Sequence, residues 1–473
     1  MYACLSNKWF PEQTFIKRKN GFMSDIAEYQ KHLHNYPQTS WLDAYVADVC
    51  GRAIGKRLPR CQIKSLYSSG SPLCAAMQLV DALGSSADPM GYGFSDGDPD
   101  AYIVPIEDTL VPVPWRDDKY AQVLCQFISG ENQQPLWHEP RHVLRQVLQR
   151  FQELQLTPVV AVELECYLLR QQRLEDGTAM PASSPLTGLP ETQGRVLSLE
   201  KLDEFAELFD AINSCCEIQK IPATTMLSEY GAGQFEINLQ HQTDALQAAD
   251  HAVMLRRAIV GMTRKHSMDA TFMSKPFADQ SGSGMHIHVS LLDKNGDNVF
   301  SPKSADGDSI LQQAIAGLQQ TMAESMAIFA PNLNVYRRYK PDEFVPITKD
   351  WGENNRSMAF RLPISDADNR RIEHRVSGAD ANPYLVIAAV LSGIHHGLTN
   401  KLKATPKARG NVGAEADASL PNTLWDALAC LRESKVLPQY LGDSYPGMYA
   451  DVKQAELDSF LETIFAREHQ WYL

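Results

Sequence analysis

No run of about 18 consecutive apolar residues occurs in this sequence, and a membrane-spanning helix needs roughly that length. The N-terminus also lacks the continuous apolar core of a secretory signal peptide. We therefore expect neither a membrane partner nor secretion, and we expect a protein of the cytoplasm.

The sequence has no excess of basic residues. Its 44 Lys and Arg residues are outnumbered by 57 Asp and Glu residues, which gives a net charge of -13. This balance argues against nucleic acid as a partner, because proteins that bind nucleic acids carry basic surfaces for the phosphate backbone. A local basic pocket for phosphate groups remains compatible with it.

The nine cysteines are odd in number and never spaced C-x-x-C, which indicates reduced thiols, most of them buried. A phosphate-binding Walker loop is also absent, although "GRAIGKRLP" has some of its letters. Three residues instead of four separate Gly51 from Gly55, and Arg57 follows Lys56.

The length of 473 residues exceeds that of one typical core, while 44% hydrophobic and 21% charged residues are ordinary for a globular protein. We expect residues 1–40 to form an N-terminal extension. Within it, residues 1–22 show no periodicity, so we expect that they do not belong to the native core. The segments "VPVPW" and "SGENQQPLW" mark a boundary. We expect one domain over 41–130 and a larger one over 131–473.

The sequence also predicts several helices and strands. The stretches "WLDAYVADVC" and "DAYIVPIED" in the first domain are typical of strands. In the second domain, "EPRHVLRQVLQRFQEL" predicts a helix with Pro140 near its start. The last 25 residues, "YADVKQAELDSFLETIFAREHQWYL", predict a helical end of the chain.

The stretch "GSGMHIHVSL" places two histidines two residues apart after a glycine-rich turn. In an extended strand His286, His288 and Ser290 share one face, and apolar residues fill the other. An ordinary half-buried strand with its polar side in water has the same pattern. Imidazole is also a frequent metal ligand and a good partner of phosphate.

Three further strands repeat this alternation, in "VVAVELECYLL", "GQFEINL" and "RRIEHRV". None of the polar faces contains a lysine, whereas solvent-facing strands usually do. We therefore expect a sheet curved around a polar cavity, with carboxylates and imidazoles for divalent cations and arginines for anionic ligands. The residues on these faces are Glu163, Glu165, Gln234, Glu236, Asn238, Arg371, Glu373 and Arg375.

Five ordered motifs carry a family resemblance: "VELECYLL", E-x6-E within "SEYGAGQFEINL", "GSGMHIHVSL", "NNRSMAFRLP" and "RRIEHRVSGADANPYL". Over roughly residues 41 to 473 the chain resembles glutamine synthetases. The resemblance implies an α+β, glutamine synthetase-like fold, with an N-terminal β-grasp-like domain and a C-terminal catalytic domain built on a curved antiparallel sheet. It also implies a dodecamer of two hexameric rings with sites between subunits.

The resemblance further implies ATP and two or more Mg²⁺ or Mn²⁺ ions, and it assigns roles by position. One ion would be held by Glu165, Glu229 and Glu236, and the second by Glu163, His286 and Glu373. His288 resembles a phosphate contact and Ser290 a nucleotide contact. The ATP phosphates would be held by Arg356 and Arg361, with Arg371 grouped with them, and glutamate by Arg338, Arg375, Ser281 and Gly282.

The chain departs from the family in one flap. Glutamine synthetases read R-x-x-P-x-x-E-x-P there, and their glutamate helps to bind and deprotonate ammonium. This chain reads "RYKPDEFVP", with Phe344 at the position of that glutamate. Glu343 is adjacent, but in an extended flap it would point to the opposite side. Asp96, Asp98 and Asp100 offer no confident counterpart of the family's ammonium-binding aspartate.

These residues favour an alkylamine over ammonium as the second substrate. Strongly hydrated ammonium is poorly matched to an aromatic wall, whereas Phe344 can pack on methylene groups. Arg338, Arg356, Glu343 and Phe344 are the expected catalytic set. Within its family the chain is most similar to γ-glutamylpolyamine or γ-glutamylputrescine synthetases. The alternatives are a γ-glutamylamide ligase for ethanolamine or aromatic amines, a glutamine synthetase, and a non-catalytic structural relative.

Overall fold

The computed structural model describes residues 26–473, so the expectation for 1–22 lies outside the described residues. The chain divides into two compact units. One contains the described residues up to Val46 together with Ile54–Ala75 and Pro99–Leu136. The other contains Ala47–Ala53, Ala76–Asp98 and Trp137–Leu473.

The first unit is a mixed sheet with two helices. Its strand order is β2-β1-β6-β4-β3, with β5 paired to β6, and β1 runs parallel to β6. The helices contact each other, and the core holds Leu42, Val123 and Phe127. The elements are α1 (Ile26–Asn35), β1 (Trp41–Ala47), β2 (Ala53–Pro59), α2 (Arg60–Ser69), β3 (Ser71–Cys74), β4 (Asp100–Pro105), β5 (Val111–Pro112) and β6 (Tyr120–Ile128).

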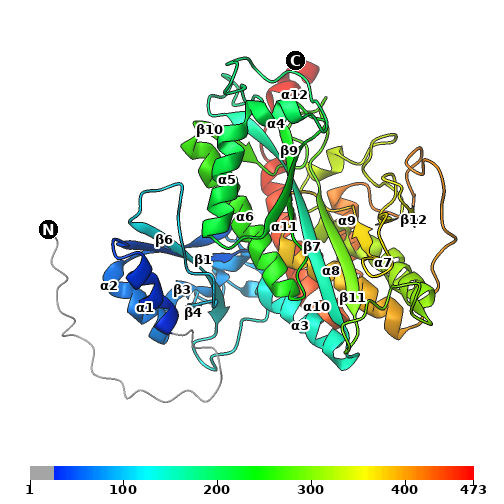
Figure 1. Ribbon diagram of the computed structural model, residues 1–473, viewed down its shortest axis with the longest axis horizontal. Coiled ribbons are helices and arrows are strands. Elements are labelled where there is room, and N and C mark those ends of the chain that lie inside the picture. The colour runs from blue at the N-terminus through cyan, green and yellow to red at the C-terminus, as the bar shows by residue number, and fades with distance from the viewer. Residues whose placement is uncertain (1–25) are drawn as a thin grey trace. The chain divides into compact units, whose positions relative to one another are not determined.

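The second unit is built on a curved sheet of the order β12-β13-β14-β11-β7-β9-β8, with β10 paired to β7 (Figure 1). The expected α+β fold with a curved sheet is confirmed, except that β12 and β13 are parallel. The strands are β7 (Thr157–Arg170), β8 (Ala223–Ser228), β9 (Gln234–Leu239), β10 (Met268–Thr271), β11 (Met285–Leu292), β12 (Trp351–Glu353), β13 (Phe360–Leu362) and β14 (Ile372–His374).

The register of this sheet brings its polar residues together. His286 on β11 is directly opposite Glu163 on β7, and His288 is opposite Glu373 on β14. Glu165 is opposite Glu236 on β9. Because directly opposed residues project to the same face of a sheet, these side chains form one polar surface.

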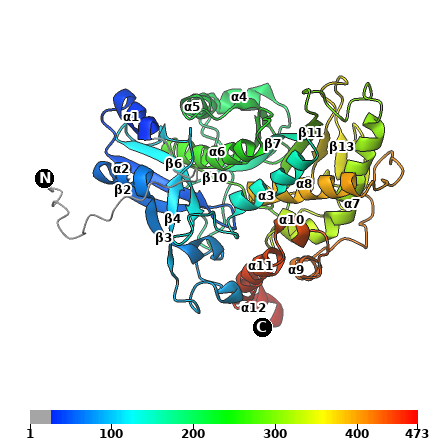
Figure 2. The same ribbon diagram turned by 90° about the horizontal axis from the view of Figure 1, so that it is seen from below.

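Helices cover the second unit's sheet and pack on one another (Figure 2). Both α3 and α6 contact β7, and α7 contacts α8, which is buried along almost its whole length. Asp244 caps α6, and Asn382 caps α8 immediately before Pro383. The helices are α3 (Pro140–Glu153), α4 (Leu199–Glu204), α5 (Ala206–Ile218), α6 (Ala245–Lys265), α7 (Gly307–Phe329), α8 (Pro383–Thr399), α9 (Leu424–Arg432) and α10 (Pro438–Leu441).

The helical end of the chain consists of two helices, α11 (Tyr445–Leu461) and α12 (Ala466–Tyr472), where the sequence suggested one stretch. Three short 3-10 helices complete the described elements: η1 (Ala75–Leu79), η2 (Pro89–Gly91) and η3 (Val335–Arg337). The eight described cysteines are free thiols, as expected. Four of the eight are buried, which is fewer than the majority that the sequence predicted.

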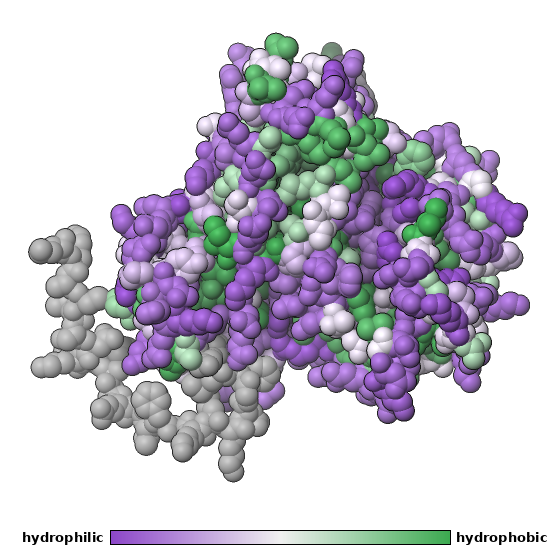
Figure 3. Space-filling model, in the orientation of Figure 1, coloured by the Kyte–Doolittle hydropathy of each residue, from purple (hydrophilic) through white to green (hydrophobic). Residues whose placement is uncertain are grey.

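The surface is mostly hydrophilic on the face drawn in Figure 3, with hydrophobic side chains gathered around α4 and β9 in its upper half. Leu199, the first residue of α4, is exposed, and so is Leu197 two residues before it. Within residues 26–473, no helix combines the length and the apolar character needed to cross a membrane.

Candidate active site

A cavity of about 720 Å³ is lined by polar residues of the second unit's sheet. Its walls come from strands β7, β9 and β11 and from the loops around residues 275–282 and 338–356. The residues predicted for the site that line it are Glu163, Glu165, Glu229, Glu236, Ser281, Gly282, His286, Arg338, Glu343, Phe344, Arg356, Arg361 and Arg375.

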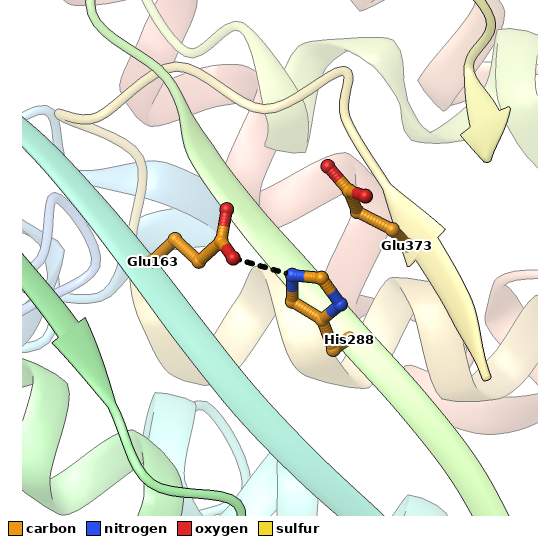
Figure 4. A group of neighbouring side chains, drawn as sticks. All are labelled: Glu163, His288 and Glu373. Carbon is orange, nitrogen blue, oxygen red and sulfur yellow. Dashed lines mark hydrogen bonds and ion pairs between the residues drawn. The ribbon is translucent and has the colours of Figure 1, made fainter. Parts of the chain in front are cut away.

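Glu163 connects the two histidines of β11. Its Oε2 atom lies 3.1 Å from Nδ1 of His286, and its Oε1 atom lies 2.8 Å from Nε2 of His288. Figure 4 shows the second contact, with Glu373 approaching from β14. Although burial opposes ionisation, His288 and His286 hold the pKa of Glu163 well below its usual range. Glu163 is therefore an anion at neutral pH.

Glu165 is fixed by donors from two neighbouring segments. Its Oε2 atom accepts hydrogen bonds from the backbone N–H of Gly284 at 3.0 Å and from Nε2 of Gln234 at 3.2 Å. Its other oxygen, Oε1, lies 3.7 Å from Nε2 of His286. One carboxylate oxygen thus holds the side chain in place, and the other remains available to a ligand.

The carboxylates of this cavity are crowded. Burial, followed by Glu229, raises the pKa of Glu165 to about 7. Burial, followed by Glu163, Glu165 and Glu229, raises the pKa of Glu236 to about 9. Burial also raises the pKa of Glu229. Like charges this close resist ionisation unless a cation lies among them.

Glu373 contacts arginines on both sides, Arg361 from β13 and Arg375 from the chain after β14. Burial alone would raise its pKa, but Arg375, followed by His288 and His286, lowers it to about 2. Its carboxylate is an anion that already has cationic partners in this structure.

Two groups of side chains offer ligand atoms within 4.8 Å of one another among the described residues. One is Glu163, His288 and Glu373, and the other is Glu163, Glu236 and His286. The family resemblance assigned Glu163, His286 and Glu373 to one ion. In the structure Glu163 belongs to both groups, and His288, expected at a phosphate, belongs to one of them.

The donor set fits hard divalent cations such as Mg²⁺ and Mn²⁺, which prefer carboxylate oxygen with some imidazole. Burial, followed by Arg375, lowers the pKa of His286, so a neutral ring offers its lone pair. Arg338 and Arg375 only partly offset the crowding at Glu165, whose pKa stays raised, and the raised pKa of Glu236 comes from burial and three neighbouring carboxylates. A metal ion would supply further positive charge there.

Three arginines of the cavity each have a buried Nε–H group without a hydrogen-bond acceptor in the described part of the chain: Arg338, Arg361 and Arg375. Arg338 is 2% exposed, and its Nη1 donates to the carbonyl of Val376 at 3.2 Å. A buried donor left unpaired costs free energy, so the cavity fits an anionic ligand that would accept these hydrogen bonds.

Arg338 also explains the glycine-rich turn. A Cβ atom on Gly282 would lie 2.6 Å from Cγ of Arg338, and one on Gly284 would lie 2.9 Å from its Nη2. Glycine is therefore required for the guanidinium to lie against the turn. The carbonyl of Ser281 accepts a hydrogen bond of 2.6 Å from the hydroxyl of Tyr167, which fixes the turn from the other side.

A second cavity of about 460 Å³ is lined by His288, Ser290 and Arg371, the residues expected to contact the nucleotide. Glu163 and Asn238 line both cavities. Nε of Arg371 donates to Nδ1 of His288 at 3.1 Å, which places the proton of His288 on Nε2, towards Glu163. Arg356 lines the first cavity and a shallow depression that also includes Phe344.

The flap differs from its expected extended form. Residues 341–345 form a turn, in which Asp342 has a φ of 61°. The expectation that Glu343 and Phe344 point to opposite sides was therefore wrong, because both line the first cavity. Alternation between two faces holds for an extended strand and fails in a turn.

Two residues that the sequence did not single out complete this wall. Lys275 is buried, its Nζ donates to the carbonyl of Gln280 at 2.6 Å, and it lies 3.5 Å from Oε2 of Glu343. The ring of Tyr230 lies 6.3 Å from that of Phe344. Both residues belong to irregular loops, where no periodic pattern exists to reveal them.

The aspartates considered as amine contacts have other surroundings. Asp96 accepts backbone hydrogen bonds from Gly93 and Asp98, as in a turn. Asp98 has a φ of 50°, and Asp100 begins β4 in the first unit. None of the three lines the cavity described above.

Comparison with known proteins gives consistent matches. The family model for the glutamine synthetase catalytic domain matches residues 138–472. Gamma-glutamylputrescine synthetase PuuA of Escherichia coli (strain K12) is 38% identical over 464 residues, which cover 98% of this chain and 97% of that protein. Glutamate–isopropylamine ligase of a Pseudomonas species is 34% identical over 375 residues, or 77% of this chain and 79% of that protein.

Among solved structures, "GmaS/ADP complex-Conformation 1" superimposes with a TM-score of 0.80 and covers 95% of this chain and 99% of that one. Its sequence identity is 24%, so this likeness supports the fold alone.

Proposed function

Because the chain belongs to the glutamine synthetase family, we propose that it is an ATP-dependent ligase for glutamate and an alkylamine, with polyamines as the preferred class. The product is a γ-glutamylamide, and γ-glutamyl phosphate is the intermediate. Two relatives, one named a gamma-glutamylputrescine synthetase and the other a glutamate–isopropylamine ligase, support this class of amine.

An alkylamine is favoured over ammonium chiefly because Phe344 forms part of the wall of the first cavity. Phe344 is 58% exposed, and its ring lies 6.3 Å from that of Tyr230, on the same cavity as the carboxylates and Arg338. Two aromatic faces suit methylene groups and a cation, whereas hydrated ammonium gains little from them. Asp279, Asp342 and Glu343 line the same cavity and offer negative charge to an amine.

Mg²⁺ or Mn²⁺ ions would be held by the carboxylates and imidazoles of the sheet face. These are Glu163, Glu165, Glu229, Glu236, His286 and Glu373, with His288 close to Glu163. Bound ions supply positive charge that offsets the repulsion between two anionic substrates.

For the first step, Arg338 and Arg375 hold the carboxylates of glutamate through their unpaired Nε–H groups. An oxygen of the γ-carboxylate attacks the γ-phosphorus of ATP, and the bond from that phosphorus to the β–γ bridging oxygen breaks. Arg356 and Arg361 line the cavity where negative charge develops on the transferring group. ADP leaves the γ-glutamyl phosphate behind.

For the second step, the neutral amine attacks the γ-carbonyl carbon, the new C–N bond forms, and the C–O bond to phosphate breaks. The amine must lose a proton, and Glu343 is the carboxylate beside Phe344 that we assign to accept it. Its neighbour Lys275, whose pKa is lowered by burial, fixes the carboxylate at 3.5 Å.

ATP would occupy the second cavity, where His288, Ser290 and Arg371 provide imidazole, hydroxyl and guanidinium contacts. A dodecamer of two hexameric rings is proposed from the family resemblance alone. The Pro-rich and polar segments of the sequence, together with the resemblance, support a β-grasp-like domain over 41–130 before a catalytic domain over 131–473, and the composition supports a place in the cytoplasm.

The test is phosphate release from ATP in the presence of glutamate, Mg²⁺ and one amine from a panel of putrescine, spermidine, isopropylamine, ethanolamine, an aromatic amine and ammonium. We expect the highest kcat/KM with putrescine or spermidine. A preference for ammonium would identify a glutamine synthetase. The absence of phosphate release with every amine, together with the absence of metal-dependent ATP binding, would identify a non-catalytic relative.

A further inference from the structure

Cys50 and Lys453 are in contact in the second unit, outside both cavities of the proposed ligase site. Cys50 lies in the segment Ala47–Ala53 between β1 and β2, and Lys453 lies on α11 (Figure 1). Sγ of Cys50 is 3.1 Å from Nζ of Lys453, although 403 positions separate the two residues in sequence. Neither residue lines the cavities that hold the proposed substrates.

The surroundings fix the lysine against the sulfur. Nζ of Lys453 also lies 3.1 Å from Oε2 of Glu456, which accepts a hydrogen bond from the backbone N–H of Ala82 at 3.2 Å. Lys453 is 2% exposed, so its ammonium group has little freedom to turn towards solvent. The segment that carries Cys50 is held as well, because Nδ2 of Asn382 donates to the carbonyl of Asp48 at 2.8 Å.

Cys50 is a free thiol of intermediate exposure. Burial raises the pKa of its thiol, and the neighbouring Lys453 opposes that shift. An oxidised cysteine can form a covalent bond with a neighbouring group, including a nitrogen. The nitrogen beside this sulfur is Nζ of Lys453. A direct bond between sulfur and nitrogen would require the two atoms to move far inside their present separation of 3.1 Å. One intervening oxygen atom spans that separation with much less movement of α11 or of the segment Ala47–Ala53.

We propose that Cys50 and Lys453 form an oxidative crosslink in which one oxygen atom joins Sγ to Nζ. Hydrogen peroxide is the oxidant. The S–H bond and two N–H bonds of the ammonium group break, and one S–O bond and one N–O bond form. Two molecules of peroxide are reduced at their O–O bonds, three molecules of water are released, and one proton goes to solvent. The four electrons taken from sulfur and nitrogen are those that reduce the peroxide.

The crosslink would join α11 to a segment that packs on the N-terminal cap of α8, since Asn382 caps that helix. A bond between residues so far apart in sequence restricts the unfolded chain much more than the folded one. We therefore expect the oxidised protein to melt several degrees higher than the reduced protein, without a change of fold.

The experiment is peptide mass spectrometry of the full chain after treatment with hydrogen peroxide. Trypsin should give the peptide 32–52 joined to the peptide 436–467, because a modified Lys453 is no longer cleaved. The mass of the joined peptide should equal the sum of both peptides plus one oxygen and minus two hydrogens. Treatment with dithiothreitol should return both to their unmodified masses.

Two variants serve as matched controls. Cys50→Ser keeps the size of the side chain without sulfur, and Lys453→Arg keeps the positive charge beside Glu456. Neither should give the joined peptide, and neither should gain thermal stability on oxidation. A direct link that lacks the oxygen, oxidation of Cys50 alone, or an unreactive Cys50 would each overturn the proposal. Ligase activity plays no part in this readout, so failure here leaves the proposed function untouched.

Discussion

Glu163 is the residue on which most contacts of the candidate site depend. It touches both histidines of β11, lines both cavities and belongs to both groups of metal-ligand atoms. Phe344 is its counterpart on the amine side, where the ring is exposed beside Tyr230. We propose that Glu163 acts in phosphoryl transfer and that Phe344 selects the amine. Substitution of Glu163 should therefore lower the rate with every amine, whereas substitution of Phe344 should change which amine is preferred.

Replacement of Glu163 or His286 by Ala should lower phosphate release by more than about a hundredfold, because a metal contact contributes several kcal/mol to stabilising the transferring group. The circular dichroism spectrum should be unchanged. Glu207→Gln, on the exposed side of α5, is the control and should keep full activity. Anomalous scattering from Mn²⁺-soaked crystals should place metal beside Glu165 and His286. Full activity of Glu163→Ala would contradict the assigned role.

Phe344→Glu should weaken the use of putrescine relative to ammonium by about 1 to 3 kcal/mol, since a carboxylate beside methylene groups replaces a hydrophobic contact. The measurement is kcat/KM for both amines, and Phe344→Leu is the control that keeps an apolar wall. We expect only partial gain of ammonium use, because Asp96, Asp98 and Asp100 do not line this cavity. An unchanged ratio of the two kcat/KM values would remove Phe344 from amine selection.

The helices α7 and α8 depend on their glycines for close packing. A Cβ atom on Gly317 of α7 would lie 1.9 Å from the carbonyl oxygen of Gly393 on α8. By contrast, Gly447 on α11 has open space where its Cβ would be. Both glycines lie in helices, so replacement by alanine changes the helix propensity at both positions. Only at Gly317 does the added methyl group also meet a neighbouring helix, and the difference between the two variants measures that contact.

Gly317→Ala should therefore destabilise the protein by about 1 to 3 kcal/mol, as overpacking does in a tight core. Gly447→Ala is the matched control and should leave the free energy of unfolding unchanged or raise it by up to about 1 kcal/mol, because alanine favours the helix. Urea unfolding of both variants measures the difference. Equal effects of the two substitutions would show that the α7–α8 contact tolerates the methyl group.

At the scale of the whole molecule, acid stability depends on buried histidines such as His138. It is 3% exposed, packs against Tyr92 and Trp137, and its Nδ1 has no hydrogen-bond partner among the described residues. Burial lowers its pKa to about 4. The unfolded chain binds a proton at about pH 6.5, so protonation favours unfolding.

His138 should therefore not reduce the free energy of unfolding above about pH 6.5. As the pH drops from there towards 4, its protonation in the unfolded chain should lower that free energy by up to about 1.4 kcal/mol per pH unit. His138→Phe keeps a ring at the site and should flatten this part of the curve. Urea unfolding between pH 7.5 and pH 4.5 measures it. A wild type and variant with parallel curves would mean that His138 is solvated and titrates normally.

Assembly is the second property at this scale. We expect light scattering at micromolar concentration to give the mass of a dodecamer, with a subunit mass of 52.8 kDa. A monomer or dimer that keeps full activity would rule out sites shared between subunits.

The sequence by itself determined the residues of the sheet face and the curved sheet that presents them. The period of two along "VELECYLL", "QFEINL" and "MHIHVSL" is a local property, and each strand buries one face whatever its neighbours are. The order of those motifs also identified the family, which the match over residues 138–472 confirms.

Only the tertiary structure decided how residues without a period come together. The turn at 341–345 brings Glu343 and Phe344 to one cavity, and Lys275 reaches Glu343 from a distant loop. Glu163 is shared between two ligand groups because four paired strands, β9, β7, β11 and β14, bring their polar residues together. Cys50 meets Lys453 across 403 positions, a contact that long-range packing creates and no local pattern encodes.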